Sequence, residues 1–296
     1  MNIVYDACPV CSNKDIRFLF PALDHTVSSQ SFEIWQCNNC SLRFTQYAPS
    51  PDKIGAFYQS ENYISHTDTT KGFINQLYHR VRKSTLVSKR KLIEHVTRND
   101  HGNILDIGAG TGSFLHTMKK AGWQVTGLEP DVTAKAKAME MYNIELHPSA
   151  QLFQLPAESF NAITMWHVLE HVHDLDSYIE QLKKLLKPDG YILIAVPNYT
   201  CYDEKVYKEF WAAYDVPRHL YHFSPEAMVY LASKHGLNLK SVKAMWYDSF
   251  YVSMLSEQYK GKGNIMKAFF TGLISDCKAL LNHKKASSLI YILRKY

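Results

Sequence analysis

The stretch Asp106-Ile107-Gly108-Ala109-Gly110-Thr111-Gly112 decides the fold class, because it joins an apolar strand to a helix through a glycine-rich turn. Residues 104–107 are predicted to form a buried strand, and residues 113–121 the helix that follows. Glycines at alternate positions let the backbone pass close to a bound molecule, where side chains would intrude. The turn is therefore predicted to hold a nucleotide-like cofactor.

The alternation of strands and helices continues through the rest of the chain. Further strands are predicted at 124–129, 144–146, 160–166, 191–196, 239–249 and 289–293. Further helices are predicted at 132–142, 175–186 and 225–235 and between 252 and 282, with a turn at 187–190. This order predicts an α/β fold class, a Rossmann-like doubly wound and mostly parallel sheet with helices on both faces.

The glycine spacing and two acidic residues narrow the choice of cofactor. A dinucleotide fingerprint expects its third glycine at the position of Ser113, one residue later than Gly112. A carboxylate at Asp106 suits an ammonium group better than a pyrophosphate, and S-adenosylmethionine carries an amino acid in place of phosphates. Glu129 ends the next strand, where it can accept hydrogen bonds from both ribose hydroxyls. The alternative roles are a turn cap for Asp106 and a solvated strand end for Glu129, but their position on neighbouring strands favours cofactor binding.

Four of the six cysteines form two close pairs, Cys8-Pro9-Val10-Cys11 and Cys37-Asn38-Asn39-Cys40. Each pair can place two thiolates on one side of a tight turn, and two such turns complete a closed tetrahedral site that suits structural zinc. A segment of about 45 residues has little area for a core of its own, so a metal would supply folding energy. We therefore predict an N-terminal zinc ribbon, with four free thiols or a redox pair as the alternatives.

Four motifs, spread in order over roughly residues 85–240, resemble those of class I S-adenosylmethionine-dependent methyltransferases. They are Leu105-Asp106-Ile107-Gly108-Ala109-Gly110-Thr111-Gly112, Val125-Thr126-Gly127-Leu128-Glu129-Pro130, Trp166-His167-Val168-Leu169-Glu170-His171-Val172 and Leu185-Leu186-Lys187-Pro188-Asp189-Gly190. The resemblance implies that Asp106, Gly108 and Gly110 line the methionine end of the cofactor, with Gly112 in the same loop. It also implies that Glu129 holds the ribose and that His167 follows the strand that floors the cofactor site.

Two positions depart from this family's pattern. The segment His147-Pro148-Ser149-Ala150 offers no carboxylate for the adenine amine, and Asn161 stands where relatives commonly carry aspartate. Ser149 and Ala150 are therefore only positional candidates for the adenine contact. The cysteine ribbon and Pro217-Arg218-His219-Leu220-Tyr221-His222-Phe223 resemble a bacterial subgroup that is linked to small-molecule and sugar modification.

The segment after the 191–196 strand is crowded with aromatic residues and is predicted to form the wall of a substrate pocket. An acceptor hydroxyl or acidic carbon would need a base of near-neutral pKa, and His219 or His222 is the predicted catalytic base. Arg218 is suited to an anionic group of the substrate. The alternative is that these side chains only pack the loop, and for His171 and His173 that packing role is favoured.

The chain is predicted to divide into a zinc ribbon (1–48), a linker with a long amphipathic helix (49–100) and a methyltransferase domain (101–296). The last domain is predicted to carry a helical insertion near 251–285. Lysines alternate with apolar residues over 260–285, which is compatible with a helix on a membrane surface or a lid. We favour a solvated helix that packs on its own domain.

The composition is that of a globular protein, with 46% hydrophobic and 21% charged residues among 296 and a formal charge of +5. No apolar stretch approaches the roughly 18 residues of a membrane span. Residues 1–11 also lack the basic start and apolar run of a secretory signal, so a cytoplasmic location is expected.

Three functions remain open from the sequence. The leading one is methyl transfer from S-adenosylmethionine to a small-molecule acceptor, such as a sugar or another biosynthetic intermediate. In the second, the ribbon recognises RNA; residues 13–40 disfavour this, because Lys14 and Arg17 are opposed by Asp15, Asp24 and Glu33. The third is a non-enzymatic regulator that binds S-adenosylmethionine. The sequence does not indicate an oligomeric state.

Overall fold

The computed structural model describes residues 2–58, 73–261 and 263–296. Its elements group into two compact units, which we call unit 1 and unit 2. Unit 1 comprises Met1–Ser65, His167–Asp176 and Ile194–Ile292, and unit 2 comprises His66–Trp166, Ser177–Leu193 and Leu293–Tyr296. The division at residues 48 and 100 stays a prediction.

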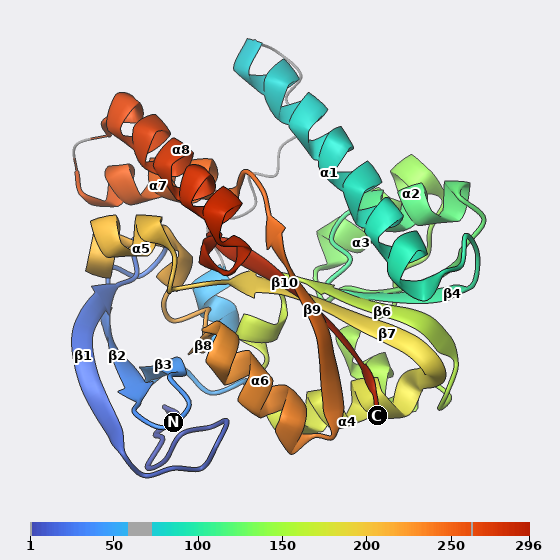
Figure 1. Cartoon of the computed structure of the whole chain (residues 1–296), viewed down its shortest axis with the longest axis horizontal. Helices are drawn as coiled ribbons and strands as arrows, with labels where there is room; N and C mark the ends of the chain where they lie inside the picture. The colour runs from blue at the N-terminus through green and yellow to red at the C-terminus, as the bar shows by residue number, and fades with distance from the viewer. Residues whose placement is uncertain (1, 59–72, 262) are drawn as a thin grey trace. The chain divides into compact units, whose positions relative to one another are not determined.

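The centre of unit 2 is strand β4 (Asn103–Ile107), which lies parallel to β5 (Gln124–Leu128) on one side and to β6 (Phe160–Trp166) on the other (Figure 1). All residues of β4 after Asn103 are buried. A continuous buried run, apolar apart from Asp106, is expected for a parallel strand that is covered on both faces. The predicted fold class is confirmed.

Unit 2 contains three helices between residues 73 and 142, and local sequence signals mark both ends of the third. Helix α1 spans Phe73–Thr97, α2 spans Ser113–Lys120 and α3 spans Val132–Tyr142. The carboxylate of Asp131 caps α3 by accepting the Ala134 N–H at 2.6 Å, and Asn143 ends it in the left-handed conformation. Helix α2 buries its apolar side chains, which are Phe114, Leu115 and Met118.

The six-stranded sheet has the order β5-β4-β6-β7-β10-β9. Strand β7 spans Leu186–Pro197, β9 spans Leu237–Met245 and β10 spans Ser288–Lys295; helix α4 (Leu175–Leu185) precedes β7. Within unit 2 the chain moves from β4 to β5 on one side and then to β6 on the other side of β4. Ligands of open α/β sheets bind at the carboxyl ends of the strands where the order reverses in this way.

Two predicted elements of unit 2 are wrong. The expected turn at 187–190 is instead the start of β7, where the Lys187 ammonium donates to Asn161 Oδ1 of β6 at 3.1 Å and holds this stretch along the sheet. The expected strand at 144–146 is reduced to a single bridge between Leu128 and His147. A short 3-10 helix, η2 (Ser149–Gln154), begins two residues later and leaves no length for a strand.

Unit 1 contains a four-stranded antiparallel sheet of order β1-β2-β3-β8. Its strands are β1 (Ile16–Leu23), β2 (Ser31–Cys37), β3 (Arg43–Gln46) and β8 (Tyr221–His222). Strand β8 comes from far along the chain and pairs with β3 through Arg43 and Phe44 (Figure 1). The cysteine segment therefore shares its sheet with the segment that carries His222.

The helices of unit 1 are α5 (Tyr202–Tyr207), α6 (Pro225–Lys234), α7 (Asp248–Tyr259) and α8 (Ile265–Leu281). Short 3-10 helices are η1 (Ile54–Tyr58), η3 (Leu169–His171), η4 (Lys208–Phe210), η5 (Ala212–Tyr214) and η6 (His283–Lys285). Buried Asp203 joins several of these elements, because its carboxylate accepts from Trp211, Ser275 and Ser287 at 2.6–2.8 Å. Among the described residues, no helix is both long and apolar enough to cross a membrane.

The packing of β5 predicts a clear effect of one substitution. A Cβ at Gly127 would lie 2.3 Å from Leu146 Cδ2 and 2.4 Å from Leu115 Cδ1. Overpacking of this kind costs about 1–3 kcal/mol. We expect Gly127→Ala to lower the free energy of unfolding by that amount in urea titrations followed by circular dichroism.

Gly55→Ala is the matched control, because a Cβ at Gly55 meets no atom within 4 Å. This variant measures only the change in unfolding free energy that arises because alanine lowers the conformational entropy of the unfolded chain. Equal unfolding free energies for the two variants would contradict the close packing of α2 against β5.

Candidate cofactor site, histidine cluster and cysteine cluster

The loop after β4 is tied to the end of β5 by three successive backbone donors. The N–H groups of Gly108 and Ala109 donate to Leu128 O at 2.8 and 3.0 Å, and the Gly110 N–H donates to Glu129 Oε2 at 2.7 Å. Gly110 has a φ of 54°, and a Cβ there would meet nothing within 4 Å. These N–H groups are used within the protein, so the loop does not present them to a pyrophosphate.

Glu129 lies just after β5 and is 7% exposed. Its Oε2 accepts from Gly110 and its Oε1 accepts from the Asp131 N–H at 2.9 Å, which fixes the carboxylate in one orientation. Burial raises the pKa of Glu129, while the two backbone hydrogen bonds lower it by less. Each oxygen retains a second lone pair. Such a carboxylate can accept a pair of hydroxyl groups, as the predicted ribose contact requires.

Asp106 occupies the buried end of β4, and its neighbour on β6 is Thr164. The two side chains lie on the same face of adjacent parallel strands, where the Thr164 hydroxyl donates to Asp106 Oδ1 at 2.6 Å. Burial raises the pKa of Asp106 to about 7; the Thr164 hydrogen bond and the charge of Lys89 lower it, and Glu129 raises it. A cation placed beside this carboxyl would favour its ionised form.

His167 follows β6 directly and is the first residue of unit 1 after the boundary at Trp166. Its φ of 58° is left-handed, and its ring lies between two carboxylates. Nδ1 is 3.4 Å from Glu170 Oε1, and Nε2 is 3.2 Å from Asp248 Oδ2. Burial lowers the pKa of His167, but the hydrogen bonds and charges of Asp248 and Glu170 outweigh it and raise the pKa to about 10. The predicted cofactor contact of His167 stays a prediction.

His222 is buried in β8, and its hydrogen bonds reveal its tautomer. The Thr45 hydroxyl donates to His219 O at 2.7 Å, so at the 3.1 Å contact with His222 it must accept from Nε2–H. Burial and the nearby charges of His219 and Arg43 lower the pKa of His222 well below its usual value. His222 is therefore a neutral ring whose Nε2 proton is held by Thr45.

His219 precedes β8 and makes a different set of contacts. Its Nδ1 lies 2.8 Å from Ala213 O, a carbonyl that can only accept, so Nδ1 carries the hydrogen. Its Nε2 is 3.8 Å from Asp215 Oδ2 and makes no hydrogen bond among the described residues. Of the two predicted bases, only His219 keeps Nε2 available, and the base assignment stays a prediction.

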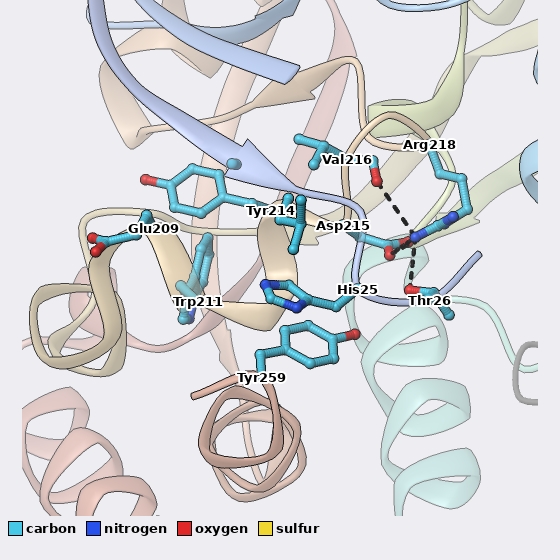
Figure 2. A pocket seen from close by; sticks show the side chains of 11 residues that line it. His25, Thr26, Glu209, Trp211, Tyr214, Asp215, Val216, Arg218 and Tyr259 are labelled. Carbon is cyan, nitrogen blue, oxygen red and sulfur yellow. Dashed lines mark hydrogen bonds and ion pairs between the residues drawn. The ribbon is translucent and has the colours of Figure 1, made fainter. Parts of the chain in front are cut away.

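Arg218 is 1% exposed and lines a small pocket with His25 and Tyr259, whose rings stack at 4.3 Å (Figure 2). Its guanidinium donates to Asp215 at 2.6 Å and to Asp24 at 3.0 Å. The cavity holds about 10 Å³, room for one water molecule. In this conformation Arg218 is neutralised by the protein's own carboxylates.

The four cysteines predicted as zinc ligands come together before β1 and around the turn between β2 and β3. Their Sγ atoms all lie within 4.8 Å of one another, and the Cys8–Cys40 and Cys11–Cys37 distances are both 3.5 Å. Four sulfurs at about 2.3 Å from one zinc ion would be about 3.8 Å apart. The cluster is thus capable of holding zinc, and no disulfide links these residues.

Two residues of these sites were missed by the sequence reasoning. Asp248, which pairs with His167, fell within the predicted strand 239–249, whereas β9 ends at Met245 and Asp248 begins α7. An acidic residue followed by serine is a helix-start signal that would have revealed it. The contact of Thr164 with Asp106 could not be predicted from the sequence, because it depends on the pairing of β4 with β6.

Residues 75–242, more than half of the chain, match the family model described as a methyltransferase domain. The chain belongs to the methyltransferase domain family. This membership and the fold confirm the resemblance to class I methyltransferases that the four motifs indicated.

Similar proteins include the ubiquinone biosynthesis O-methyltransferase of Haemophilus ducreyi, 35% identical over 112 residues that cover 33% of this chain and 46% of that protein. The mitochondrial enzyme of the same name from Homo sapiens is 27% identical over 50% of this chain and 44% of its own length. The chain thus spans less than half the length of these relatives. A S-adenosylmethionine-dependent methyltransferase structure from Archaeoglobus fulgidus shares the fold, with a TM-score of 0.50, 18% identity and coverage of 76% of this chain and 100% of that one.

The buried Asp106 predicts a pH-dependent stability. The carboxyl of Asp106 loses its proton near pH 4 in the unfolded chain but only near pH 7 in the folded protein. The buried side chain therefore lowers the free energy of unfolding more and more as the pH rises from about 4 to 7. We expect Asp106→Asn to match the wild type in thermal stability near pH 4. Near pH 8 it should exceed the wild type by about 2–4 kcal/mol in the free energy of unfolding.

The control is Asp189→Asn, since the Asp189 side chain is fully exposed. Its difference from the wild type should not change over the same range. A pH-independent effect of Asp106→Asn would overturn the assignment of a raised pKa to this carboxyl.

Proposed function

We propose that this chain transfers a methyl group from S-adenosylmethionine to a small-molecule acceptor. The observation that carries the proposal is the pair of buried carboxylates, Asp106 and Glu129, at the ends of neighbouring strands beside an open Gly110. Membership of the methyltransferase domain family supports the reaction type. The relatives named O-methyltransferases support an acceptor hydroxyl, with a sugar or another biosynthetic intermediate as the class of molecule.

The cofactor's chemical groups match the residues at this edge of unit 2. Its ammonium group would neutralise Asp106, which is poised to ionise near pH 7, and its ribose hydroxyls would donate to the oriented Glu129. When bound, S-adenosylmethionine supplies an electrophilic methyl group on a sulfonium. The protein's own part is to orient the acceptor and to take its proton; of the two predicted bases, only His219 has an Nε2 that is not used in a hydrogen bond among the described residues.

The cysteine cluster is proposed to hold one structural zinc ion. A closed four-thiolate site fits the Sγ spacing, and its turns lead into β1 and connect β2 with β3. Zinc would thereby hold the first three strands of the antiparallel sheet.

Removing two thiolates should abolish this site. We expect Cys11→Ser/Cys40→Ser to contain one equivalent of zinc less than the wild type by atomic emission, and to melt at a lower temperature. Cys277→Ser is the control, because Cys277 is exposed and lies outside the cluster. Zinc-free wild-type protein, or full zinc content in the double variant, would refute the proposal.

Calorimetric titration with S-adenosylmethionine tests the cofactor site. Loss of two charge-assisted contacts of about 1.5–3 kcal/mol each should raise the Kd of Asp106→Ala/Glu129→Ala at least about 100-fold. Glu158→Ala/Asp189→Ala, which removes two exposed carboxylates, should bind as the wild type does. Unchanged affinity in the first double variant would sink the cofactor assignment.

Methyl incorporation from labelled cofactor separates the possible acceptors. Turnover with hydroxylated aromatic compounds or sugars supports the proposed function. Turnover with RNA alone would replace it with nucleic-acid methylation. Tight cofactor binding without transfer to any acceptor class would favour the regulator.

A further inference from the structure

Unit 1 contains a second cluster of metal-ligating side chains besides the cysteines. Glu170 and His171 lie on η3, and His219 lies between η5 and β8. One ligand atom from each of the three residues lies within 4.8 Å of the others. The two imidazole rings meet edge to face, with centroids 4.6 Å apart.

Both histidines place the same ring nitrogen, Nδ1, against a backbone carbonyl. His171 Nδ1 lies 3.0 Å from Arg218 O, and His219 Nδ1 lies 2.8 Å from Ala213 O. A carbonyl only accepts, so both Nδ1 atoms carry hydrogen, and the His171 hydrogen is shared with the Tyr58 hydroxyl oxygen at 3.0 Å. In this tautomer the lone pair of each ring is on Nε2. Metal-ligating histidines are typically oriented by such a bond from the other ring nitrogen.

The third member, Glu170, is completely buried, and its carboxylate has unusual surroundings. Neither oxygen accepts a hydrogen bond among the described residues, although His167 Nδ1 lies 3.4 Å from Oε1. A buried carboxylate without hydrogen bonds is costly unless it has a further partner.

The surrounding charges favour a cation as that partner. Four carboxylates lie in the cluster or in ion pairs with Arg218 and His167, which are close to its members in the chain. The carboxylates belong to Asp24, Glu170, Asp215 and Asp248. This acidic surrounding favours a divalent cation over an anion at the cluster.

We propose that Glu170, His171 and His219 form a binding site for a divalent first-row transition metal ion. Two imidazoles and one carboxylate are a ligand set for iron, cobalt, zinc or manganese, and three protein ligands leave positions open for other oxygens. Ligand atoms at about 2.1 Å from one ion are at most about 4.2 Å apart. Ligand atoms that all lie within 4.8 Å of one another therefore need at most a small contraction when the ion binds.

This site differs from the cysteine cluster in ligands and in coordination. Four thiolates complete the coordination of a zinc ion, whereas three protein ligands leave coordination positions open, and an oxygen bound at one of them would have its pKa lowered by the ion. If the proposed methyl transfer to a hydroxyl is correct, the ion would activate that hydroxyl and His219 would act as a ligand rather than as a base. Binding of the ion itself does not depend on the methyl-transfer proposal.

Cobalt(II) titration of the full chain, with zinc in the cysteine cluster, tests the site directly. We expect one Co²⁺ per chain without the charge-transfer absorption of cobalt thiolates. In proton NMR, two hyperfine-shifted resonances that disappear in D₂O should arise from the Nδ1–H groups of His171 and His219. This spectrum needs no variant, and a bound cobalt ion without such resonances would overturn the proposal.

Variants provide the second measurement. His219→Gln should weaken Co²⁺ binding at least about tenfold and remove one shifted resonance. His173→Gln is the control, since its Nε2 contacts Pro49 O outside the cluster, and it should bind as the wild type does. The absence of Co²⁺ binding beyond the cysteines, or equal affinity in a folded His219→Gln protein, would refute the site. Titration with S-adenosylmethionine in the absence of cobalt tests the cofactor proposal independently of the metal site.

Discussion

The hydrogen bond from the Gly110 N–H to the Glu129 carboxylate is the interaction on which the cofactor edge of unit 2 depends. Parallel strands end together at one edge, where backbone groups lose their strand partners. Here the loop after β4 recovers partners from the end of β5, through Leu128 O and the Glu129 side chain. These hydrogen bonds fix the conformation of the loop beside Asp106 without the need for a bound anion. An acidic, preorganised edge of this kind suits a positively charged amino-acid moiety more than a phosphate.

Unit 1 is built around buried charges, and most of them are paired within the protein. Arg218 is held by Asp215 and Asp24, and Arg43 by Glu204 at 2.6 Å. Removing one partner of such a pair leaves an uncompensated charge and costs several kcal/mol. These pairs therefore fix the loops that carry the histidines. Glu170 departs from this pattern, because its carboxylate lacks hydrogen bonds where the other carboxylates have them.

The sequence predicted the parts of this structure that follow from local patterns. The bounds of α3 and β6 were predicted correctly, since the Asp131 cap and an uninterrupted apolar run mark them. The pairing of β3 with β8 could not be predicted, because two short strands separated by most of the chain carry no local signal of their contact. The same limit applies to the sites. The residue spacing predicted the cysteine cluster and the glycine loop. The pairing of His167 with Asp248 could not be predicted, because it depends on how α7 packs.

Hydrogen bonds, more than sequence position, divide the histidines of unit 1 by chemical role. His222 has its Nε2 proton committed to Thr45, and its burial keeps it neutral, so it serves the packing of β3 against β8. His219 and His171 instead commit Nδ1 to carbonyl groups, which directs their Nε2 lone pairs away from the backbone. A base needs such a lone pair, and so does a metal ligand. What distinguishes the two roles is Glu170: a buried carboxyl group without hydrogen bonds beside two imidazoles has little purpose for proton transfer, but it completes a ligand set.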